Sequence, residues 1–271
     1  MNVLSCRGHE LPIGDRTIIM GILNVTPDSF SDGGEYVRVA DAVSRARQMV
    51  AEGADIIDIG GESTRPGFAA VTQEEELRRV IPVIEALRRE VNVPISIDTY
   101  KAEVAQQALE AGAHIINDVW GGQADARMAI VAASYDCPFI ITHNRTNSVY
   151  SDFIPDVIND LLLYTKQALE AGVREERIIL DPGIGFAKSY EQNLQLMNQL
   201  AAITALGYPV LLGTSRKSVI GLTLNLPPEE RLEGTASTVV LGIAQGCGII
   251  RVHDIQAMKR VAVMTDAIIR S

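Results

Sequence analysis

Polar residues recur in this sequence directly after short apolar stretches, and their types suit the binding of a flat, polar ring. Two carboxylates, Asp98 and Asp181, and one carboxamide, Asn117, each follow such a stretch. Carboxylates accept hydrogen bonds and an amide both accepts and donates, so the three match an amino-pyrimidinone edge. Lys217 and Arg251 follow two further apolar stretches and would donate to the ring's carbonyl and nitrogens. The planar guanidinium can also stack on the ring face.

A second set of residues, which shares Lys217 and Arg251 with the first, suits a phosphate group. It consists of one amide and four cationic or partly cationic side chains: Asn24, Arg65, Lys217, Arg251 and His253. The set could hold a diphosphate together with Mg²⁺, because that ion binds through few protein ligands and keeps its waters. Ser218 stands where a helix is expected to begin, and the amide groups of that helix end could receive a carboxylate.

Two simpler explanations of the acidic residues are considered. Clustered carboxylates can bind a metal, but the sequence has no His-x-x-x-His pair or carboxylate-dense loop typical of zinc or all-protein calcium sites. Any single Asp or Asn after a strand can also be a turn or cap residue. Unpaired polar groups buried in one cavity cost about 1–3 kcal/mol each, so the whole set favours a binding site.

The polar residues follow strands in a repeating strand–loop–helix pattern. Strands are expected at 17–23, 55–59, 94–97, 114–116, 139–142, 177–180, 209–212 and 248–250. Helices are expected at about 38–52, from 73, 101–111, 126–135, 156–171, 190–206, from 218 to 245 with an interruption at Pro227-Pro228, and after 254. Three glycines that precede strands are expected to end helices in a left-handed conformation: Gly53, Gly112 and Gly172.

This pattern predicts a parallel sheet that closes into a single (β/α)8 TIM barrel over residues 1–271, with residues 1–16 as a short N-terminal β-hairpin. Active sites of such barrels form where the strands end. The polar residues expected to converge at this mouth are Asn24, Glu62, Asp98, Asn117, His143, Asp181, Lys217, Arg251 and His253.

The loop after the first strand has the profile of a binding loop. The stretch Met20–Gly34 reads MGILNVTPDSFSDGG and turns polar at Asn24. A loop that only connects a strand to a helix is commonly about 2–6 residues long. This one is longer and carries Asp28, Phe30 and Asp32, so it is expected to bind a ligand.

Composition restricts the compartment and the partners. The formal net charge of −10 argues against a nucleic-acid partner, which requires basic surfaces. Cys6, Cys137 and Cys247 are odd in number and far apart, as expected in a reducing compartment. No signal-peptide pattern and no uninterrupted apolar run of about 18 residues is present, so we expect a cytoplasmic protein without a membrane partner.

Seven stretches of the sequence resemble the dihydropteroate synthase family, in order and at the ends of the expected strands. They are NVTPDSFSDGG at 24–34, GGESTRPG at 60–67, SIDT at 96–99, IND at 116–118, DPGIGFAK at 181–188, TSRKS at 214–218 and RVHD at 251–254. The resemblance implies a folate-pathway transferase, the target of sulfonamides. It would join 4-aminobenzoate to (7,8-dihydropterin-6-yl)methyl diphosphate and release diphosphate, through an SN1-like pterin cation.

The resemblance also implies roles for individual residues. Asp98, Asn117, Asp181, Lys217 and Arg251 would bind the pterin; Asn24, Arg251 and His253 the diphosphate; and Asn24 the Mg²⁺ cofactor. The aminobenzoate site would comprise Thr64, Pro66, Phe186, Lys217 and Ser218. The catalytic residues would be Asp32, Arg65, Asp98 and Lys217.

One position departs from the family pattern, and two other functions are compatible with a pterin-binding barrel. Many members have Met-His after the fifth strand, where this chain has Thr142-His143. A pterin-binding methyltransferase would use a similar barrel but not TPDSFSDGG, STRP or SRK. A non-catalytic pterin-binding homologue is expected to lack loop or phosphate residues that stand here. The resemblance further implies a homodimer, which the apolar segments Val239–Leu241 and Val261–Val263 permit.

Overall fold

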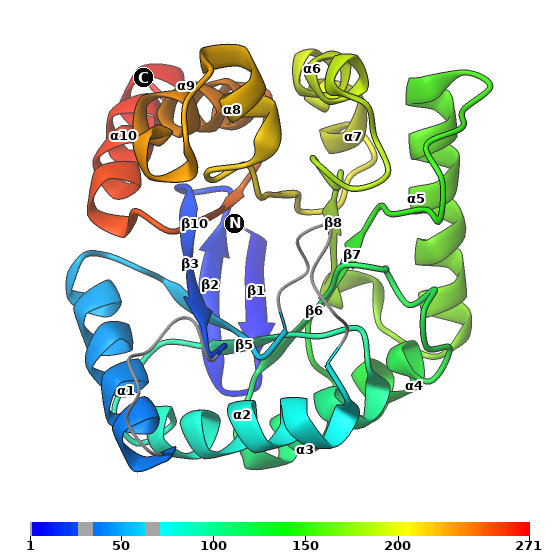
Figure 1. Cartoon of the computed structure of the whole chain (residues 1–271). Coiled ribbons are helices and arrows are strands. Elements are labelled where there is room, and N and C mark those ends of the chain that lie inside the picture. Colours follow the sequence, from blue (N-terminus) through cyan, green and yellow to red (C-terminus); the bar gives the residue numbers. More distant parts are fainter. Residues whose placement is uncertain (1, 27–34, 63–70) are drawn as a thin grey trace.

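The strands form a ring at the centre of the molecule. The computed structural model describes residues 2–26, 35–62 and 71–271, and in it eight strands are hydrogen-bonded in the order β8–β7–β6–β5–β4–β3–β10–β9. A parallel bridge between Leu180 and Val210 joins the two ends of this order and closes the barrel. Figure 1 shows the helices around the strands. The predicted (β/α)8 barrel is confirmed.

Each strand of the barrel is followed by one or more helices. The strands are β3 (Ile18–Asn24), β4 (Ile56–Gly60), β5 (Ile95–Asp98), β6 (Ile115–Asp118), β7 (Phe139–Thr142), β8 (Ile178–Asp181), β9 (Leu211–Leu212) and β10 (Ile249–Val252). The α-helices are α1 (Glu35–Ala51), α2 (Gln73–Leu87), α3 (Ala102–Ala111), α4 (Met128–Ser134), α5 (Phe153–Glu170), α6 (Tyr190–Asn198), α7 (Leu200–Thr204), α8 (Ser218–Leu224), α9 (Leu232–Ala244) and α10 (Ile255–Ile269). None of these helices is long and apolar enough to cross a bilayer.

Three of the expected elements differ from the structure. The helix predicted at 190–206 is two helices, because the backbone at Gln199 leaves the helical conformation with φ −123°. The segment from 218 ends its first helix at Asn225, whose left-handed φ of 54° stops α8 before Pro227. β9 contains only Leu211 and Leu212, although the two residues before it still pair with β8, through the bridge of Val210 to Leu180 and the Leu180 amide, which donates to the Pro209 carbonyl at 2.9 Å. The left-handed conformations of Gly53, Gly112 and Gly172 are confirmed.

Alternate residues along the strands face the barrel interior, because successive side chains of a strand point to opposite faces. At one end of the barrel these residues are apolar and form a fully buried cluster from seven of the eight strands, β5 excepted: Ile18, Met20, Ile56, Ile115, Ile140, Ile179, Leu211 and Ile249. On β5 the corresponding residue is Ser96, in register between Asp58 and Ile115. Two positions further along the strands the same face becomes polar, and there the site begins.

The predicted N-terminal hairpin closes the apolar end of the barrel. β1 (Asn2–Cys6) and β2 (His9–Ile13) pair antiparallel with Leu4 opposite Leu11. Leu4 and Leu11 belong to the same buried cluster as the interior residues of the strands. Arg177, just before β8, donates to the Ser5 carbonyl and ties the hairpin to the barrel. The open end of the barrel is therefore the one with polar residues.

This arrangement predicts that a hairpin side chain contributes to stability like a core residue. Leu11→Ala should lower the free energy of unfolding by about 2–5 kcal/mol, because it empties volume below the barrel interior. Val3→Ala in the neighbouring strand, where the side chain is 52% exposed, should change it by about 0.5 kcal/mol or less. Urea unfolding of both variants measures the difference, and equal effects would contradict a plug role for the hairpin.

Candidate active site at the barrel mouth

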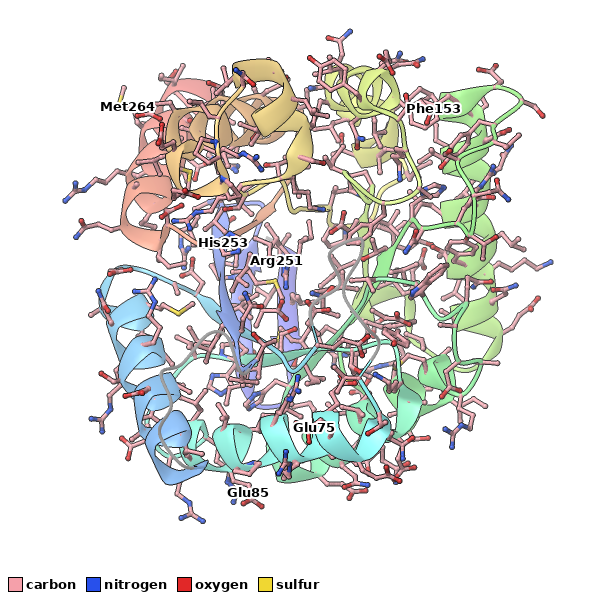
Figure 2. The ribbon with its side chains drawn as sticks, in the orientation of Figure 1. Glu75, Glu85, Phe153, Arg251, His253 and Met264 are labelled. Atoms are coloured by element: carbon pink, nitrogen blue, oxygen red, sulfur yellow. The ribbon has the colours of Figure 1, made fainter. Side chains whose placement is uncertain are left out.

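Two buried carboxylates and one guanidinium form the centre of the mouth. Arg251 Nε donates to Asp58 Oδ2 at 2.6 Å, and Arg251 Nη2 donates to Asp98 Oδ2 at 2.6 Å. Asn117 Nδ2 donates to the same oxygen of Asp58 at 3.1 Å. Figure 2 shows Arg251 near the middle of the ring of helices. Three of the predicted pterin-binding residues are therefore joined: Arg251 contacts Asp98 directly and Asn117 through Asp58.

Burial controls the ionisation of this cluster. It raises the pKa of Asp98 to about 7, and the nearby carboxylate of Asp58 adds to the shift, although Arg251 opposes it. Burial alone would lower the pKa of Arg251, but Asp58 and Asp98 outweigh that effect and raise it. Arg251 thus stays charged, and Asp98 can hold or release a proton near neutral pH.

The cluster leaves buried acceptors without partners. In the part of the chain that the structure describes, no group hydrogen-bonds to Asp58 Oδ1, Asp98 Oδ1 or Ser96 Oγ. Leaving such atoms unpaired costs about 1–3 kcal/mol each, which a ligand with matching N–H groups would recover. A buried acceptor on Asp98 is what the sequence predicts for reading a polar ring edge.

Asp181 and Lys217 form the other wall of the mouth. Asp181 Oδ1 accepts from the Gly183 amide at 2.7 Å. A Cβ atom at Gly213 would lie 3.8 Å from Asp181 Oδ2 and 3.9 Å from Arg251 Cβ, so Asp181 and Arg251 flank this glycine. Lys217 Nζ donates to the Ile184 carbonyl and lies 4.4 Å from the centre of the Phe186 ring. Burial lowers the pKa of Lys217 to about 8, with Asp181 opposing the shift.

The other two predicted diphosphate residues, Asn24 and His253, stand at the ends of β3 and β10, which are neighbours in the barrel. Asn24, Gly60, Asp98 and Asn117 are in register across β3 to β6. A Cβ atom at Gly60 would stand 3.7 Å from both Asn24 Oδ1 and Asp98 Oδ2, so these two side chains share one space. His253 follows β10, and Figure 2 shows it between Arg251 and the helices at the end of the chain.

A hydroxyl fixes the orientation of His253. Ser215 Oγ lies 2.9 Å from His253 Nδ1 and accepts from the His253 backbone amide at 3.2 Å. The neighbouring residues Arg216 and Asp254 form a two-pronged ion pair with distances of 3.0 and 2.6 Å. The loops after β9 and β10 are thereby held together, and Ser215 fixes the position of the His253 ring through its Nδ1 side.

The structure brings most of the predicted residues to one mouth. Five strands and three adjoining loops contribute Asn24, Asp98, Asn117, Asp181, Phe186, Lys217, Arg251 and His253. Ser218 is the first residue of α8, as predicted, although this helix is only seven residues long. The remaining predicted site residues, Asp32, Thr64, Arg65 and Pro66, lie outside the described residues, as do Asp28 and Phe30.

Two residues expected at the mouth point elsewhere. The imidazole of His143 is fully buried and contacts Asp160 of α5, because it is the preceding residue, Thr142, that has the inward position in register with Asp181. Glu62 accepts from Tyr100 at 2.9 Å and from Lys101 at 2.5 Å, and Lys101 also contacts the buried Glu76. These side chains support the loops and do not line the centre of the mouth.

Sequence reasoning missed Asp58 and Ser215. Asp58 has no exposed surface and lies inside the stretch Asp55–Ile59, which reads as an ordinary buried strand. The available signal was that Asp58 stands two positions after Ile56 and so shares its face of the strand. Charged residues are almost never fully buried without a partner, so a carboxylate on that face indicates a buried cation near it. Ser215 belongs to the stretch TSRKS, but nothing in the sequence indicates that its hydroxyl contacts His253.

A cavity also opens away from the predicted residues. It has a volume of about 730 Å³ and lies between the loops that follow β6 and β7, with Trp120, Gln123, Asn144 and Arg145 among its lining residues. None of the residues predicted from the sequence lines it. The buried, partly unpaired groups lie inside the barrel, so the chemistry belongs there.

Comparison with known proteins agrees with this geometry. The family model described as pterin binding enzyme matches residues 20–253. The dihydropteroate synthase of Clostridium beijerinckii is 57% identical over 262 residues, which is 96% of this chain and 97% of that protein. A Clostridium difficile dihydropteroate synthase solved in the presence of pteroic acid has a TM-score of 0.94 at 53% identity, covering 96% of this chain and 100% of that one.

A third relative was solved with a product-like ligand. The Xanthomonas albilineans dihydropteroate synthase in complex with 7,8-dihydropteroate has a TM-score of 0.90 at 41% identity, covering 98% of both chains. The match of the family model, the identity over nearly the whole length and the shared fold all lead to one assignment. The chain belongs to the pterin binding enzyme family and, within it, to the dihydropteroate synthases.

Proposed function

We propose that the barrel mouth condenses 4-aminobenzoate with (7,8-dihydropterin-6-yl)methyl diphosphate to give 7,8-dihydropteroate and diphosphate. The observation that carries this proposal is the set Asp98, Asn117, Asp181, Lys217 and Arg251, buried or partly buried, which offers both acceptors and donors around one space. A pterin ring presents the complementary pattern. The identity with dihydropteroate synthases excludes the methyltransferase-like barrel, and the non-catalytic pterin-binding homologue is an outcome of the product-formation test.

The acidic residues would bind and activate the pterin. Asp181 and Asn117 would take the N–H groups of the amino-pyrimidinone edge, and the free oxygen of Asp98 would accept from the other ring. When the bond between the methylene carbon and the diphosphate oxygen breaks, its electron pair leaves with the diphosphate and the dihydropterin ring shares the positive charge. Carboxylates fixed beside that ring stabilise the cation without having to reorganise.

The cationic residues would receive the leaving group and the second substrate. Arg251 and His253 would neutralise the diphosphate as it departs. Lys217, Phe186 and the first turn of α8 at Ser218 would hold 4-aminobenzoate at the rim, with its amine toward the methylene carbon. The aromatic amine attacks as a neutral group and then loses a proton, so no strong base is needed.

Mg²⁺ is proposed as the cofactor. Within residues 2–26, 35–62 and 71–271, no group of three or more His, Cys, Asp or Glu residues is arranged to hold a metal ion. The side-chain oxygen of Asn24 fits an ion that takes most of its ligands from water and substrate phosphate. When bound, Mg²⁺ would offset the charge that develops on the diphosphate.

A homodimer through the C-terminal helices is also proposed. Large apolar side chains are exposed on α8, α9 and α10, among them Leu222 (67%), Val240 (43%), Val263 (58%) and Met264 (62%). Figure 1 shows these helices grouped on one side of the barrel, and Figure 2 shows Met264 at the outer edge of that group.

A reducing, cytoplasmic location is proposed as well. The three cysteines are unpaired and buried, which supports this proposal.

The first test is product formation by the purified protein. We expect diphosphate release and dihydropteroate formation that depend on 4-aminobenzoate and on Mg²⁺. Asp181→Ala should reduce kcat/KM by at least about a hundredfold, because it removes charge-assisted hydrogen bonds to the pterin. Glu85→Gln on the exposed face of α2 is the control and should leave the rate unchanged. Pterin binding without product would favour the non-catalytic homologue.

The raised pKa of Asp98 predicts a pH-dependent stability difference. This carboxyl titrates near 3.8 in an unfolded chain and near 7 in the folded protein. Its contribution to stability is therefore complete below the unfolded value and is lost as the pH rises through the folded value. As the pH rises between these two pKa values, the free energy of unfolding of Asp98→Asn should increase relative to the wild type by about 1.4 kcal/mol per pH unit. Above the folded-state pKa this difference should stay constant.

Urea unfolding of the wild type and Asp98→Asn at about pH 5, 6 and 8 measures this difference. Glu85→Gln again serves as the control, since its side chain is exposed. A stability difference that stays constant over this range would show that Asp98 keeps an ordinary pKa in the folded protein. The variant should also lose activity, because Asn cannot stabilise a pterin cation with a full charge.

The proposed dimer predicts an effect of charge on α10. Met264→Asp should convert a dimer into a monomer in light scattering, because a carboxylate buried in an apolar interface lacks a partner. Ile130→Asp on α4 is the matched control, since Ile130 is 54% exposed and Figure 1 places α4 far from α10. A wild type that is monomeric at micromolar concentration would contradict the proposal.

A further inference from the structure

The loop Gly183–Lys188, between β8 and α6, has little support of its own. Its one internal backbone hydrogen bond in the structure runs from the Phe186 amide to the Gly183 carbonyl at 3.1 Å. Gly183, Gly185 and Ala187 all have positive φ, at 70°, 87° and 47°. A non-glycine residue in this conformation is uncommon and is tolerated only where the surroundings hold it.

Three side chains hold the carbonyl groups of this loop: its own last residue, Lys188, and two residues from outside it, Tyr150 and Lys217. Lys188 Nζ donates to the Gly183 and Phe186 carbonyls, both at 2.9 Å. The hydroxyl of Tyr150 donates to the Ala187 carbonyl at 2.8 Å. Lys217 donates to the Ile184 carbonyl. The carbonyls of the loop that carries Phe186 are therefore held by three side chains, while Asp181 and Asn193 accept from its Gly183 and Gly185 amides.

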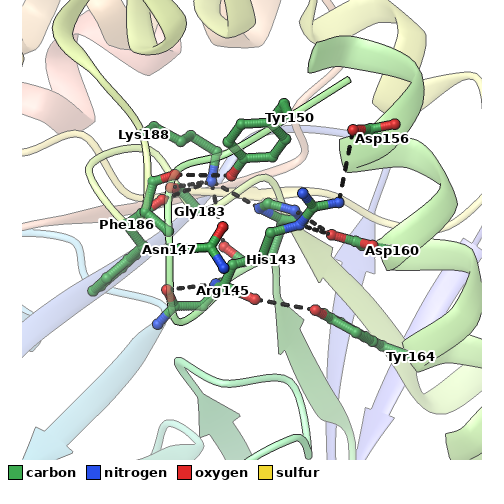
Figure 3. A network of polar contacts seen from close by, with 12 residues as sticks. His143, Arg145, Asn147, Tyr150, Asp156, Asp160, Tyr164, Gly183, Phe186 and Lys188 are labelled. Atoms are coloured by element: carbon green, nitrogen blue, oxygen red, sulfur yellow. Dashed lines mark hydrogen bonds and ion pairs between the residues drawn. The ribbon is translucent and has the colours of Figure 1, made fainter. Parts of the chain in front are cut away.

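His143 completes the coordination of Lys188. The ammonium group has three N–H bonds, and its third short contact is to His143 Nδ1 at 2.8 Å. His143 Nε2 lies 3.0 Å from Asp160 Oδ2, which also accepts from Arg145 Nε. Figure 3 shows this chain of contacts running from α5 through His143 to Lys188. With Nδ1 accepting and Nε2 donating, the tautomer of the imidazole is fixed.

The ionisation of His143 agrees with that role. Burial lowers the pKa of the imidazole to about 3, and the charge of Lys188 adds to the effect. The ring is therefore neutral, as it must be for Nδ1 to accept a hydrogen bond. A protonated His143 would present a second cation to Lys188 instead of an acceptor.

We infer that Lys188 and His143 are positioning residues that, anchored by Asp160, hold the loop Gly183–Lys188 so that Phe186 and Lys217 face 4-aminobenzoate. This inference rests on the proposed function, since it assigns the loop to the aminobenzoate side of the mouth. Neither residue touches a substrate in this scheme. Their effect passes through the carbonyls of Gly183 and Phe186.

Two substitutions of His143 separate its two contacts. In His143→Asn the amide oxygen takes roughly the place of Nδ1 and can still accept from Lys188. In His143→Gln the amide nitrogen takes roughly the place of Nε2 and can still donate to Asp160, but Lys188 loses its acceptor. The two variants remove the same ring and differ in which neighbour keeps its hydrogen bond.

The expected result is a difference in KM. His143→Gln, which removes one hydrogen bond from Lys188, and Lys188→Met, which removes three short ones, should each raise the KM for 4-aminobenzoate by roughly tenfold or more. The KM for the dihydropterin diphosphate should change less, because three of the five proposed pterin-binding residues, Asp98, Asn117 and Arg251, come from strands β5, β6 and β10, although Asp181 and Lys217 contact the loop. His143→Asn and Lys188→Arg should retain most of the wild-type KM for 4-aminobenzoate.

Amide hydrogen exchange of residues 183–188 provides a readout independent of turnover. Faster exchange in His143→Gln than in His143→Asn supports the inference, even if the wild type forms no product and the proposed function fails. Equal exchange in the two variants overturns it. Loss of thermal stability with unchanged KM values also overturns it, since that result assigns both residues to stability alone.

Discussion

One guanidinium in the dry interior of the barrel makes the rest of the mouth possible. Asp58 has no exposed surface, and an isolated charge there would be very costly in free energy. Arg251 offsets it through a 2.6 Å contact and extends the same neutralisation to Asp98. Removing one member of such a buried pair leaves the other charge without compensation. The stability of each of Asp58, Asp98 and Arg251 in this position therefore depends on the other two.

The residues of the site are held in place in two ways, by the strands of the barrel and by side-chain hydrogen bonds to a loop. Asp58, Asp98 and Asn117 project from strands whose backbone is held on both sides by the barrel, so their spacing follows from the register. Phe186 stands on a loop whose carbonyls need Lys188 and Tyr150. The part of the mouth that would hold the pterin is therefore fixed by the fold, and the part that would hold 4-aminobenzoate is fixed by side chains.

Most of the fold and of the pterin side of the site could be predicted from the sequence, because both follow from the same alternation. A strand that is apolar until its last residue places that residue at the mouth, which identified Asp98, Asn117 and Asp181. The choice between Thr142 and His143 could not be made in this way. Two adjacent polar residues point to opposite faces, and only the register with β8 shows that Thr142 faces inward.

Other features gave no local signal. Asp58 lies within an apolar strand, and its partner Arg251 is 193 residues away in the chain. The helix breaks at Gln199, although the helical periodicity of the sequence continues across this residue and no Pro or Gly marks the boundary. The contact of Lys188 with His143 joins two loops that are separated by 45 residues. Each of these depends on tertiary packing, which overrides local preference.

The hairpin plug also sets an order of events during synthesis. Leu4 and Leu11 precede the barrel strands in the chain, yet the cluster that buries them includes Leu211 and Ile249 from the last two of those strands. Because domains fold as units and long-range contacts close late, the apolar face of the hairpin must wait for the whole barrel. The segment that seals the barrel is thus made before the strands it packs on and is buried only after them.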